Sequence, residues 1–469
     1  MSMMMTKRLP RRLVLPAITL ALLAGCQSLP RNEAPPLPSE WHARDAAAPL
    51  RVPSEQAWWQ GFGDPSLSRF IDAALARNTD LASAAWRIRN AQLRAGAATQ
   101  ALFPTPNGSM GGGSARAAPQ AGQPVPSWQH STHASLGVGW ELDLWGRIRD
   151  QRTAAVWEAQ ATADDRDAVA LSLTGNVARQ YWQIAALQAR IERADDSLAT
   201  AQRTLELTRV QYRAGAISGL DLAQAEQSLQ TQQAARVQLQ QQWDDARNAF
   251  SLLFDLPPPQ LPEGRQVDTV QALSAQVPDI PAGVPADVLT RRPDLRAAQQ
   301  RLEATLLNIR ITRKQFLPGV SLTGNLGSGG TQLKDILSAP SQSLGIGISL
   351  PFLNVPEMIR APKIAANDYE IAVLGYRQSV YRALSEVESA LSGLQAQRRQ
   401  VTLQQEALER ARRIERMNEV RYRAGANPLR LWLDAQEARR QAELALIDAR
   451  FNALQAAANL HLALGGSLR

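Results

Sequence analysis

The chain has 469 residues, of which 45% are hydrophobic and 5% aromatic, with a formal net charge of +8 and one cysteine. A single cysteine excludes an intramolecular disulfide. Four histidines, with no nucleophile motif or metal-ligand cluster, give an enzyme little to work with. We therefore expect no catalytic residue, no metal site and no cofactor beyond any covalent lipid.

Residues 1–25 have the layout of a secretory signal. Four basic residues between Lys7 and Arg12 precede an apolar run over 13–24, which is too short to span a bilayer as a helix. Removing this signal lowers the net charge from +8 to +4, and nucleic-acid binding loses most of its support. No later stretch has the roughly eighteen apolar residues of a transmembrane helix, so a mature chain that crosses a membrane must do so as a barrel.

The signal ends in Leu-Ala-Gly-Cys at 23–26. This sequence resembles the bacterial lipobox, in which the thiol is acylated and becomes the new N-terminus. We expect lipid on Cys26, followed by an extended lipidated segment over 26–65. The next residue is Gln27, and in lipoproteins with similar signals the lack of Asp there goes with sorting to the outer membrane. The alternative is an ordinary cleaved signal with an incidental buried cysteine.

Two tandem structural repeats are predicted to follow, at 66–270 and 271–469. Tyr-Arg-Ala-Gly-Ala occurs at 212–216 and again at 422–426, and a helix entry beginning at Asn78 has a counterpart beginning at Arg292. A period of about 210 residues is long for a solenoid repeat and fits a duplicated domain.

Each copy is predicted to have the same order of elements. The first has a helix from Thr79 to Phe103, strands near 107–118 and 131–144, a long helix over 147–214 and a helix over 217–253. A Pro-rich belt near 254–292, joined by the termini, separates the copies because its prolines cannot continue a helix. The second copy has a helix over 293–316, strands near 318–330 and 341–353, a long helix over 358–424 and a helix over 427–464.

The two long helices share a seven-residue apolar spacing, which indicates coiled-coil packing. Each would be roughly 100 Å long at the helical rise. Each ends at an Arg-Ala-Gly turn, where Gly215 or Gly425 suits the left-handed conformation that closes a helix. The spaced positions are Val177, Ile184, Ile191, Leu198, Leu205 and Tyr212 in the first helix, and Val387, Leu394, Val401, Leu408, Glu415 and Tyr422 in the second.

The glycine-rich segments alternate between apolar and small or polar residues, as tilted membrane strands do. The first strand, mostly glycine over 109–114, is inferred from the repeat instead of from its own pattern. The alternative is a soluble two-sided hairpin packed on the helices. The apolar positions are Leu136, Val138, Trp140, Leu142 and Leu144 in the first copy, and Val320, Leu322, Leu326, Leu344, Ile346, Ile348 and Leu350 in the second.

Four strands cannot close a barrel, and an open sheet edge cannot face lipid. Several chains must therefore contribute to one barrel, and three copies would give twelve strands, an even number within the known range.

The whole pattern resembles the outer membrane factor family of TolC-like ducts, and within it the lipoprotein branch of the OprM and NodT type. The resembling residues cover nearly the whole mature chain. They are Cys26, the Arg-Arg-Pro-Asp-Leu entry at 291–295, the paired Tyr-Arg-Ala-Gly turns and Trp-Glu-Leu-Asp-Leu-Trp-Gly-Arg at 140–147. One departure is Asn354-Val355-Pro356-Glu357, where the family usually has an Asp/Gly-rich turn before the second long helix.

The resemblance implies a mainly α-helical chain with a membrane β part, assembled as a homotrimer. Four strands per chain would form a twelve-stranded β-barrel in the outer membrane, continued by a twelve-helix α-barrel in the periplasm with a mixed equatorial belt. It implies the exit duct of a tripartite efflux system, with a periplasmic membrane-fusion adaptor, outer-membrane lipid, and an inner-membrane pump, commonly the proton-driven resistance-nodulation-division type.

The periplasmic turns are where such a duct would close at rest. We expect inter-helix hydrogen bonds and charge pairs there, with adaptor docking on the turn residues releasing them. Asn427 occupies the position where some relatives have a basic residue. An ionic latch at that position is therefore absent, or Arg430 forms it instead. The gate candidates are Tyr212, Asp221, Tyr422, Asp434 and Arg430, and the adaptor-contact candidates are Arg213, Gly215, Arg423 and Gly425. Alternatively, the tyrosines are coiled-coil knobs and the aspartates first-turn charges favoured by the helix dipole.

Two other functions remain open. A free-standing porin would conduct without a pump partner, although it has no use for such long helices. A lipid-anchored coiled-coil spacer would need no alternating strands and would leave the membrane without detergent once its lipid was removed.

Overall fold

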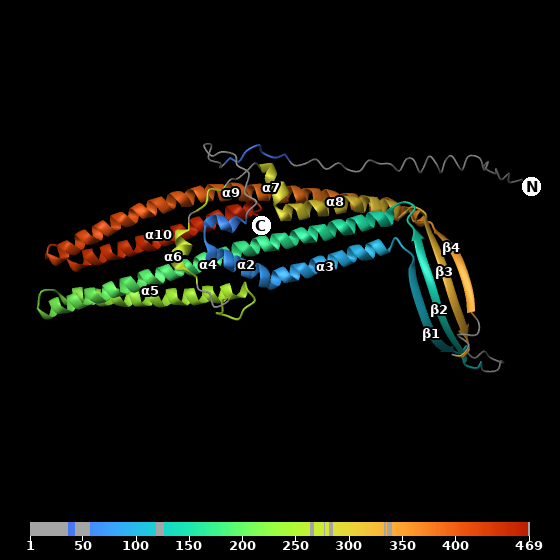
Figure 1. Ribbon diagram of the computed structural model, residues 1–469, viewed down its shortest axis with the longest axis horizontal. Helices are drawn as coiled ribbons and strands as arrows, with labels where there is room; N and C mark the ends of the chain where they lie inside the picture. Colours follow the sequence, from blue (N-terminus) through green and yellow to red (C-terminus); the bar gives the residue numbers. More distant parts are fainter. Residues whose placement is uncertain are drawn as a thin grey trace, which may run out of the picture. The chain divides into compact units, whose positions relative to one another are not determined.

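The computed structural model describes residues 36–42, 57–118, 126–262, 267–275, 277–280, 285–332, 334 and 340–467. From Leu37 onward the chain forms one compact unit, in which long helices lie side by side and a sheet follows at one end (Figure 1). Cys26 and the predicted signal over 1–25 lie outside the described residues. No described helix is long and apolar enough to cross a membrane.

The order of elements in the first half recurs in the second. The first half contains η1 (Trp58–Phe62), α2 (Pro65–Arg77), α3 (Thr79–Gln100), β1 (Thr105–Ala115), β2 (Gln129–Leu142), α4 (Arg147–Arg213) and α5 (Gly219–Leu252). The second contains α6 (Thr269–Ser274), α7 (Pro285–Arg291), α8 (Pro293–Lys314), β3 (Gly319–Gly330), β4 (Pro340–Ser349), η4 (Pro351–Leu353), α9 (Val355–Arg423) and α10 (Leu429–Ala463).

Local signals in the sequence explain where the helices begin and end. The Asn78 side chain accepts hydrogen bonds from two backbone N–H groups of α3 and caps it. Both α4 and α9 end in the same hydrogen-bonded turn, in which Gly215 and Gly425 each have φ near 71°. The N–H of the residue after each glycine bonds back to the third-last helical carbonyl, which is the Schellman arrangement.

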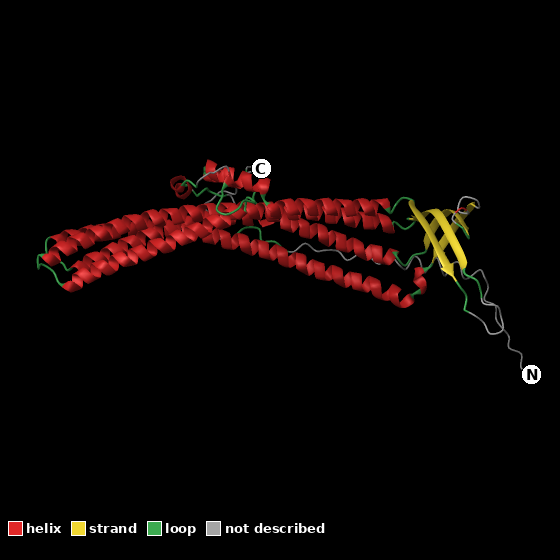
Figure 2. Cartoon of the chain, turned by 90° about the horizontal axis from the view of Figure 1, so that it is seen from below, coloured by secondary structure: helices red, strands yellow, loops and turns green. Residues whose placement is uncertain are grey.

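The helix α4 has neighbours along both of its sides. In the part nearer the sheet it packs against α3 and α8, and in the part nearer the turns it packs against α5 and α10. The other long helix, α9, packs against α8 and then α10. Neighbouring helices therefore follow the order α3–α4–α8–α9 near the sheet and α5–α4–α10–α9 near the turns (Figure 1). Figure 2 shows the same helices from below.

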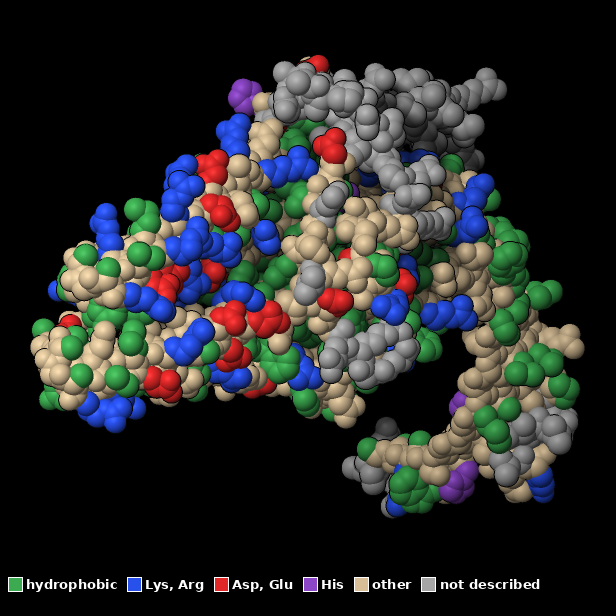
Figure 3. All heavy atoms as spheres, turned by 60° about the vertical axis from the view of Figure 1, so that its left-hand side comes forward, with side chains coloured by type: hydrophobic (Ala, Val, Ile, Leu, Met, Phe, Trp, Pro, Cys, Tyr) green, Lys and Arg blue, Asp and Glu red, His purple; other side chains and the backbone are tan. Residues whose placement is uncertain are grey.

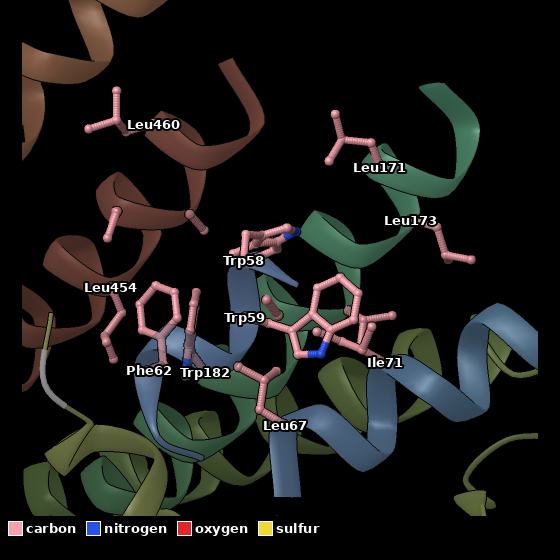
Figure 4. Close-up of a cluster of buried hydrophobic side chains, with 14 of the residues drawn as sticks. Trp58, Trp59, Phe62, Leu67, Ile71, Leu171, Leu173, Trp182, Leu454 and Leu460 are labelled. Carbon is pink, nitrogen blue, oxygen red and sulfur yellow. The ribbon is translucent and has the colours of Figure 1, made fainter. Parts of the chain in front are cut away.

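An aromatic core lies where α2, α4 and α10 meet (Figure 4). The Phe62 and Trp182 rings lie 5.0 Å apart, and the Trp58 indole N–H donates to the Thr174 hydroxyl over 3.1 Å. These residues are almost fully buried. The prediction of an extended segment over 26–65 is therefore wrong at its end: Trp58–Phe62 forms a 3₁₀ helix because its aromatic side chains pack into this core.

His461 lies in the same core, with its ring tilted against Trp58 at a centroid distance of 5.5 Å, and its Nε2 has no hydrogen-bond partner among the described residues. Burial lowers its pKa to about 4. Below pH 6.5 the unfolded chain takes up a proton that the folded chain does not, so stability falls as the pH drops towards 4. We expect a loss of about 3 kcal/mol across this window, measured by denaturant unfolding. The variant His461→Phe should flatten this dependence, and an unchanged slope would contradict the assignment.

The last predicted strand is shorter than expected. We expected it to reach residue 353, but β4 ends at Ser349 and Pro351–Leu353 turns into a 3₁₀ helix, because proline cannot donate to a strand ladder. The following helix α9 begins at Val355, earlier than the expected 358, with Pro356 in its first turn. Proline is tolerated there because the first turn needs no N–H donor.

Candidate functional site

The sheet has a single antiparallel order, β1-β2-β3-β4, and its register separates two faces. Directly paired residues share a face: Val138 and Leu344 lie opposite Gly324, and Trp140 and Ile346 lie opposite Leu322. The other face has glycine and polar residues, most of them small. The apolar face comprises Leu136, Val138, Trp140, Leu142, Val320, Leu322, Leu326, Leu344, Ile346 and Ile348.

This apolar face is exposed in the single chain. Leu344 is 94% and Ile346 is 74% exposed, far from any hydrophobic core. Charged side chains are interspersed over the helices but few lie on the sheet (Figure 3). A large exposed apolar patch beside a polar face indicates a surface that meets lipid or another chain.

The two helical turns lie together at the end of the bundle away from the sheet (Figures 1 and 2). A small hydrophobic cluster joins them, built from both hairpins: Leu205, Ala225, Tyr422, Leu429 and Trp432. The α4–α5 hairpin is therefore tied to the α9–α10 hairpin of the same chain.

Tyr422 is the centre of this contact. Its ring stacks on Trp432 at 5.2 Å, and its hydroxyl donates to Gln211 on α4 over 2.6 Å. Burial raises the pKa of Tyr422, and the Asp221 carboxylate raises it further. The phenol therefore remains protonated and keeps its donor role at ordinary pH.

Tyr212 has the same sequence context but a different environment. It is 46% exposed, whereas Tyr422 is 7% exposed. In the single chain the α4–α5 hairpin covers Tyr422, whereas Tyr212 stays exposed.

Asp221 lies in a reciprocal cap at the start of α5. Its carboxylate accepts from the Ser218 N–H at 3.1 Å and from the Ser218 hydroxyl at 2.7 Å, and the Ser218 hydroxyl accepts from the Asp221 N–H. This is a capping box. Asp221 therefore has a local role in starting the helix, and its charge also faces Tyr422.

The charged candidates on α10 lie apart from that contact. Arg430 and Asp434 are 3.8 Å apart on successive turns of one helix, and both side chains are highly exposed. Asn427 donates to Asn418 at 3.1 Å. The single chain thus contains no latch between hairpins through Arg430 among its described ion pairs.

All four adaptor-contact candidates are exposed at the turns. Arg423 pairs with Glu419 at 2.7 Å, and Arg213 donates to the Arg209 carbonyl. Gly215 and Gly425 expose the backbone of the two hairpin turns. Because both turns have the same conformation, each chain presents the same backbone surface twice.

Gln211 and Trp432 are contact residues that sequence reasoning missed. Trp432 follows Pro428 in an apolar run at a new helix start, which is a signal for a buried first turn. Gln211 carried no signal, because a polar residue beside the heptad positions is ordinarily solvated. In the part of the chain that the structure describes, no group of three His, Cys, Asp or Glu side chains could hold a metal ion.

Comparison with known families identifies this arrangement. The outer membrane efflux protein family matches residues 70–254 and 284–466. The chain belongs to this family. Its members are outer-membrane channels, so the outer membrane is where this efflux protein functions.

Relatives align in sequence with nearly the full length of this efflux protein. It is 33% identical to the pyoverdine export outer membrane protein OpmQ of Pseudomonas putida over 98% of each chain. It is 31% identical to the antibiotic efflux pump outer membrane protein ArpC of Pseudomonas putida, covering 96% of this chain and 94% of the relative. The solved outer-membrane channel OprN superposes with a TM-score of 0.79 at 27% identity, covering 94% of this chain and 99% of OprN.

Proposed function

We propose that three copies of this chain form the exit duct of a tripartite efflux system. The four-stranded sheets would join into one twelve-stranded barrel in the outer membrane, and the helices would continue it as a twelve-helix tunnel into the periplasm. The two tandem halves would supply equivalent parts of both.

The observation that carries this proposal is the register of the sheet. It collects the large apolar side chains of three adjacent strands on one face and glycine and polar residues on the other. Lipid on one side and water on the other require this division. The edge strands β1 and β4 have unpaired ladder groups, which lipid cannot satisfy and which the edges of further copies can.

The turns would form the periplasmic gate and the docking site of the partners. Tyr422 and its contacts hold two hairpins together, and the exposed turns at Gly215 and Gly425 offer surfaces to a periplasmic membrane-fusion adaptor. The adaptor would link the duct to an inner-membrane pump, of the proton-driven resistance-nodulation-division type. Small organic compounds are the cargo to test first, since the compared relatives are named for pyoverdine and antibiotics.

The test is copurification and export. The tagged chain, extracted in detergent, should run as a trimer and bring down an adaptor and a pump. Deleting its gene should raise the accumulation of a fluorescent pump substrate, and restoring the gene should reverse this. A detergent-indifferent monomer would overturn the proposal, and a conducting trimer without any pump dependence would favour a porin.

Cys26 is proposed to carry lipid. The variant Cys26→Ala should lose the mass of the acyl chains in intact-protein mass spectrometry and accumulate with an uncleaved signal. The matched control Gln27→Ala keeps the thiol and should remain lipidated. Cleavage of the Cys26→Ala chain at the same site would contradict lipoprotein processing.

A further inference from the structure

The polar face of the sheet has very few ionisable groups. All four strands lie within the residues that the structure describes, and their titratable side chains are His130, His133 and Glu141. The strands contain no lysine, arginine or aspartate. The charge of this face therefore depends on these few side chains.

Two of the three add no uncompensated charge to the polar face. Glu141 pairs with Arg147 at 2.6 Å. His130 is an even-numbered residue of β2, as the apolar positions are, so it lies on the apolar face, where its Nδ1 is 2.7 Å from the Ser114 hydroxyl. Among the described strand residues, His133 remains as the titratable group of the polar face that no ion pair compensates.

The strand register gives the His133 side chain a defined place. His133 is exposed and pairs directly with Gly111 on β1 and Gly329 on β3. A Cβ added at Gly111 would lie 2.8 Å from the His133 Cε1, which is closer than non-bonded carbon atoms approach. The imidazole therefore lies over Gly111, in space that any other residue at that position would fill.

In the proposed twelve-stranded barrel the polar face is the surface of the lumen. The wall of such a barrel lies roughly 12 Å from its axis at ordinary strand spacing and tilt. Electrostatic screening in physiological salt extends over about 8 Å. Charges on imidazoles that stand inside this wall, one from each copy, therefore act on ions across the lumen. An imidazole in contact with water changes its charge between about pH 5 and 8.

Other charged residues near this end of the sheet belong to the connecting loops. Arg116 follows β1, and Lys334 and Asp335 follow β3. The Arg116 Nε donates to the Pro126 carbonyl. Arginine, lysine and aspartate keep their charges between about pH 5 and 8. These residues therefore contribute a constant charge, and the change with pH comes from His133.

We propose that His133 determines the charge selectivity of the barrel lumen. At acidic pH the protonated imidazoles favour anionic over cationic cargo, and at alkaline pH the neutral imidazoles remove this preference. This inference rests on the proposed trimer and adds to it a residue that discriminates cargo by charge.

Reversal potentials of the purified full-length trimer in planar lipid bilayers test the proposal. Under a salt gradient they give the ratio of anion to cation permeability. We expect this ratio to rise roughly two- to fivefold between about pH 8 and about pH 5. His133→Asn, whose side chain stays neutral, should lose this rise. A His133→Asn channel with the native rise overturns the proposal.

Two further variants separate the position of the imidazole from a general effect of substitution. His130→Asn changes the histidine of the apolar face and should keep the native rise. The double variant Ser131→His, His133→Ser moves the imidazole along the polar face to the position opposite Gly113. It should restore the rise that His133→Asn loses, and its failure to do so would show that the histidine acts other than through its charge in the lumen.

The variant His133→Cys tests the position without titration. Cys26 is the only native cysteine, and the native protein treated in the same way reports any reaction there. A membrane-impermeant, positively charged methanethiosulfonate reagent should raise the permeability ratio at about pH 8, as protonation of the imidazole does. A negatively charged reagent should lower it. Leu136→Cys, on the apolar face, should not respond.

Failure of this inference is distinguishable from failure of the proposed duct. If the native protein forms conducting trimers and His133→Cys responds to neither reagent, His133 lies outside the lumen and the inference is wrong, whereas the duct stands. If the native protein forms no conducting trimer, the proposed function fails first.

Discussion

Replacing Tyr422 and Asp221 together with alanine should raise the single-channel conductance of the purified protein in planar lipid bilayers. The change removes the hydrogen bond to Gln211, the stack on Trp432 and the capping box at Ser218. Loss of a buried aromatic side chain and its hydrogen bond should weaken the contact between hairpins by about 3 kcal/mol. The turns then separate more often.

The single variant Tyr422→Phe separates the two contributions. It keeps the stack on Trp432 and loses only the hydrogen bond, worth about 1 kcal/mol, so its conductance should rise less. If the double variant conducts as the native channel does, the two residues are packing and capping residues of the turns and have no part in a gate.

Replacing Ile346 with arginine should abolish assembly in the outer membrane. Ile346 is 74% exposed on the apolar face of the sheet, and at a water-facing site this substitution would be harmless. Facing lipid near the middle of a membrane strand, the charge costs about 2–4 kcal/mol per chain, and a trimer contains the substitution three times. The measurement is the amount of heat-resistant trimer in the outer-membrane fraction.

Ser343→Arg is the matched control. Ser343 is an odd-numbered residue of the same strand and lies opposite Asn325 on the polar face, so the charge should be tolerated and should change only conductance. Equal assembly of the two variants would show that the apolar face does not contact lipid.

Long, regular elements were the easiest to locate from the sequence. The first long helix was expected over 147–214 and spans Arg147–Arg213, because the heptad spacing and the turn glycine are both local signals. The ends of β4 and α9 were less well placed. Residues 351–357 contain two prolines, and whether a proline ends a strand or begins a helix depends on the neighbouring packing.

The aromatic core could not be anticipated. Trp58, Phe62 and Trp182 come from segments far apart in the sequence, and their contact depends on how α2, α4 and α10 meet. The 3₁₀ helix at Trp58 is a result of that tertiary packing, and local propensity gave no sign of it.

The candidate gate illustrates the same limit. Tyr212 and Tyr422 lie in identical pentapeptides and adopt the same helix end, so the sequence could not distinguish them. Only the placement of the second hairpin buries one and exposes the other. Asp221 and Asp434 differ in the same way: one lies in a cap beside a buried tyrosine, and the other lies on an exposed helix surface.

The continuity of α4 and α9 has a mechanical consequence. Near the aromatic core α5 and α10 end, and α3 and α8 begin farther along, so only α4 and α9 have an unbroken backbone through this level. A force applied at the turns is transmitted past it by two rods per chain, whereas four rods share it elsewhere. Tertiary packing in the aromatic core therefore has to hold the ends of the interrupted helices together at this level, where their backbones do not continue.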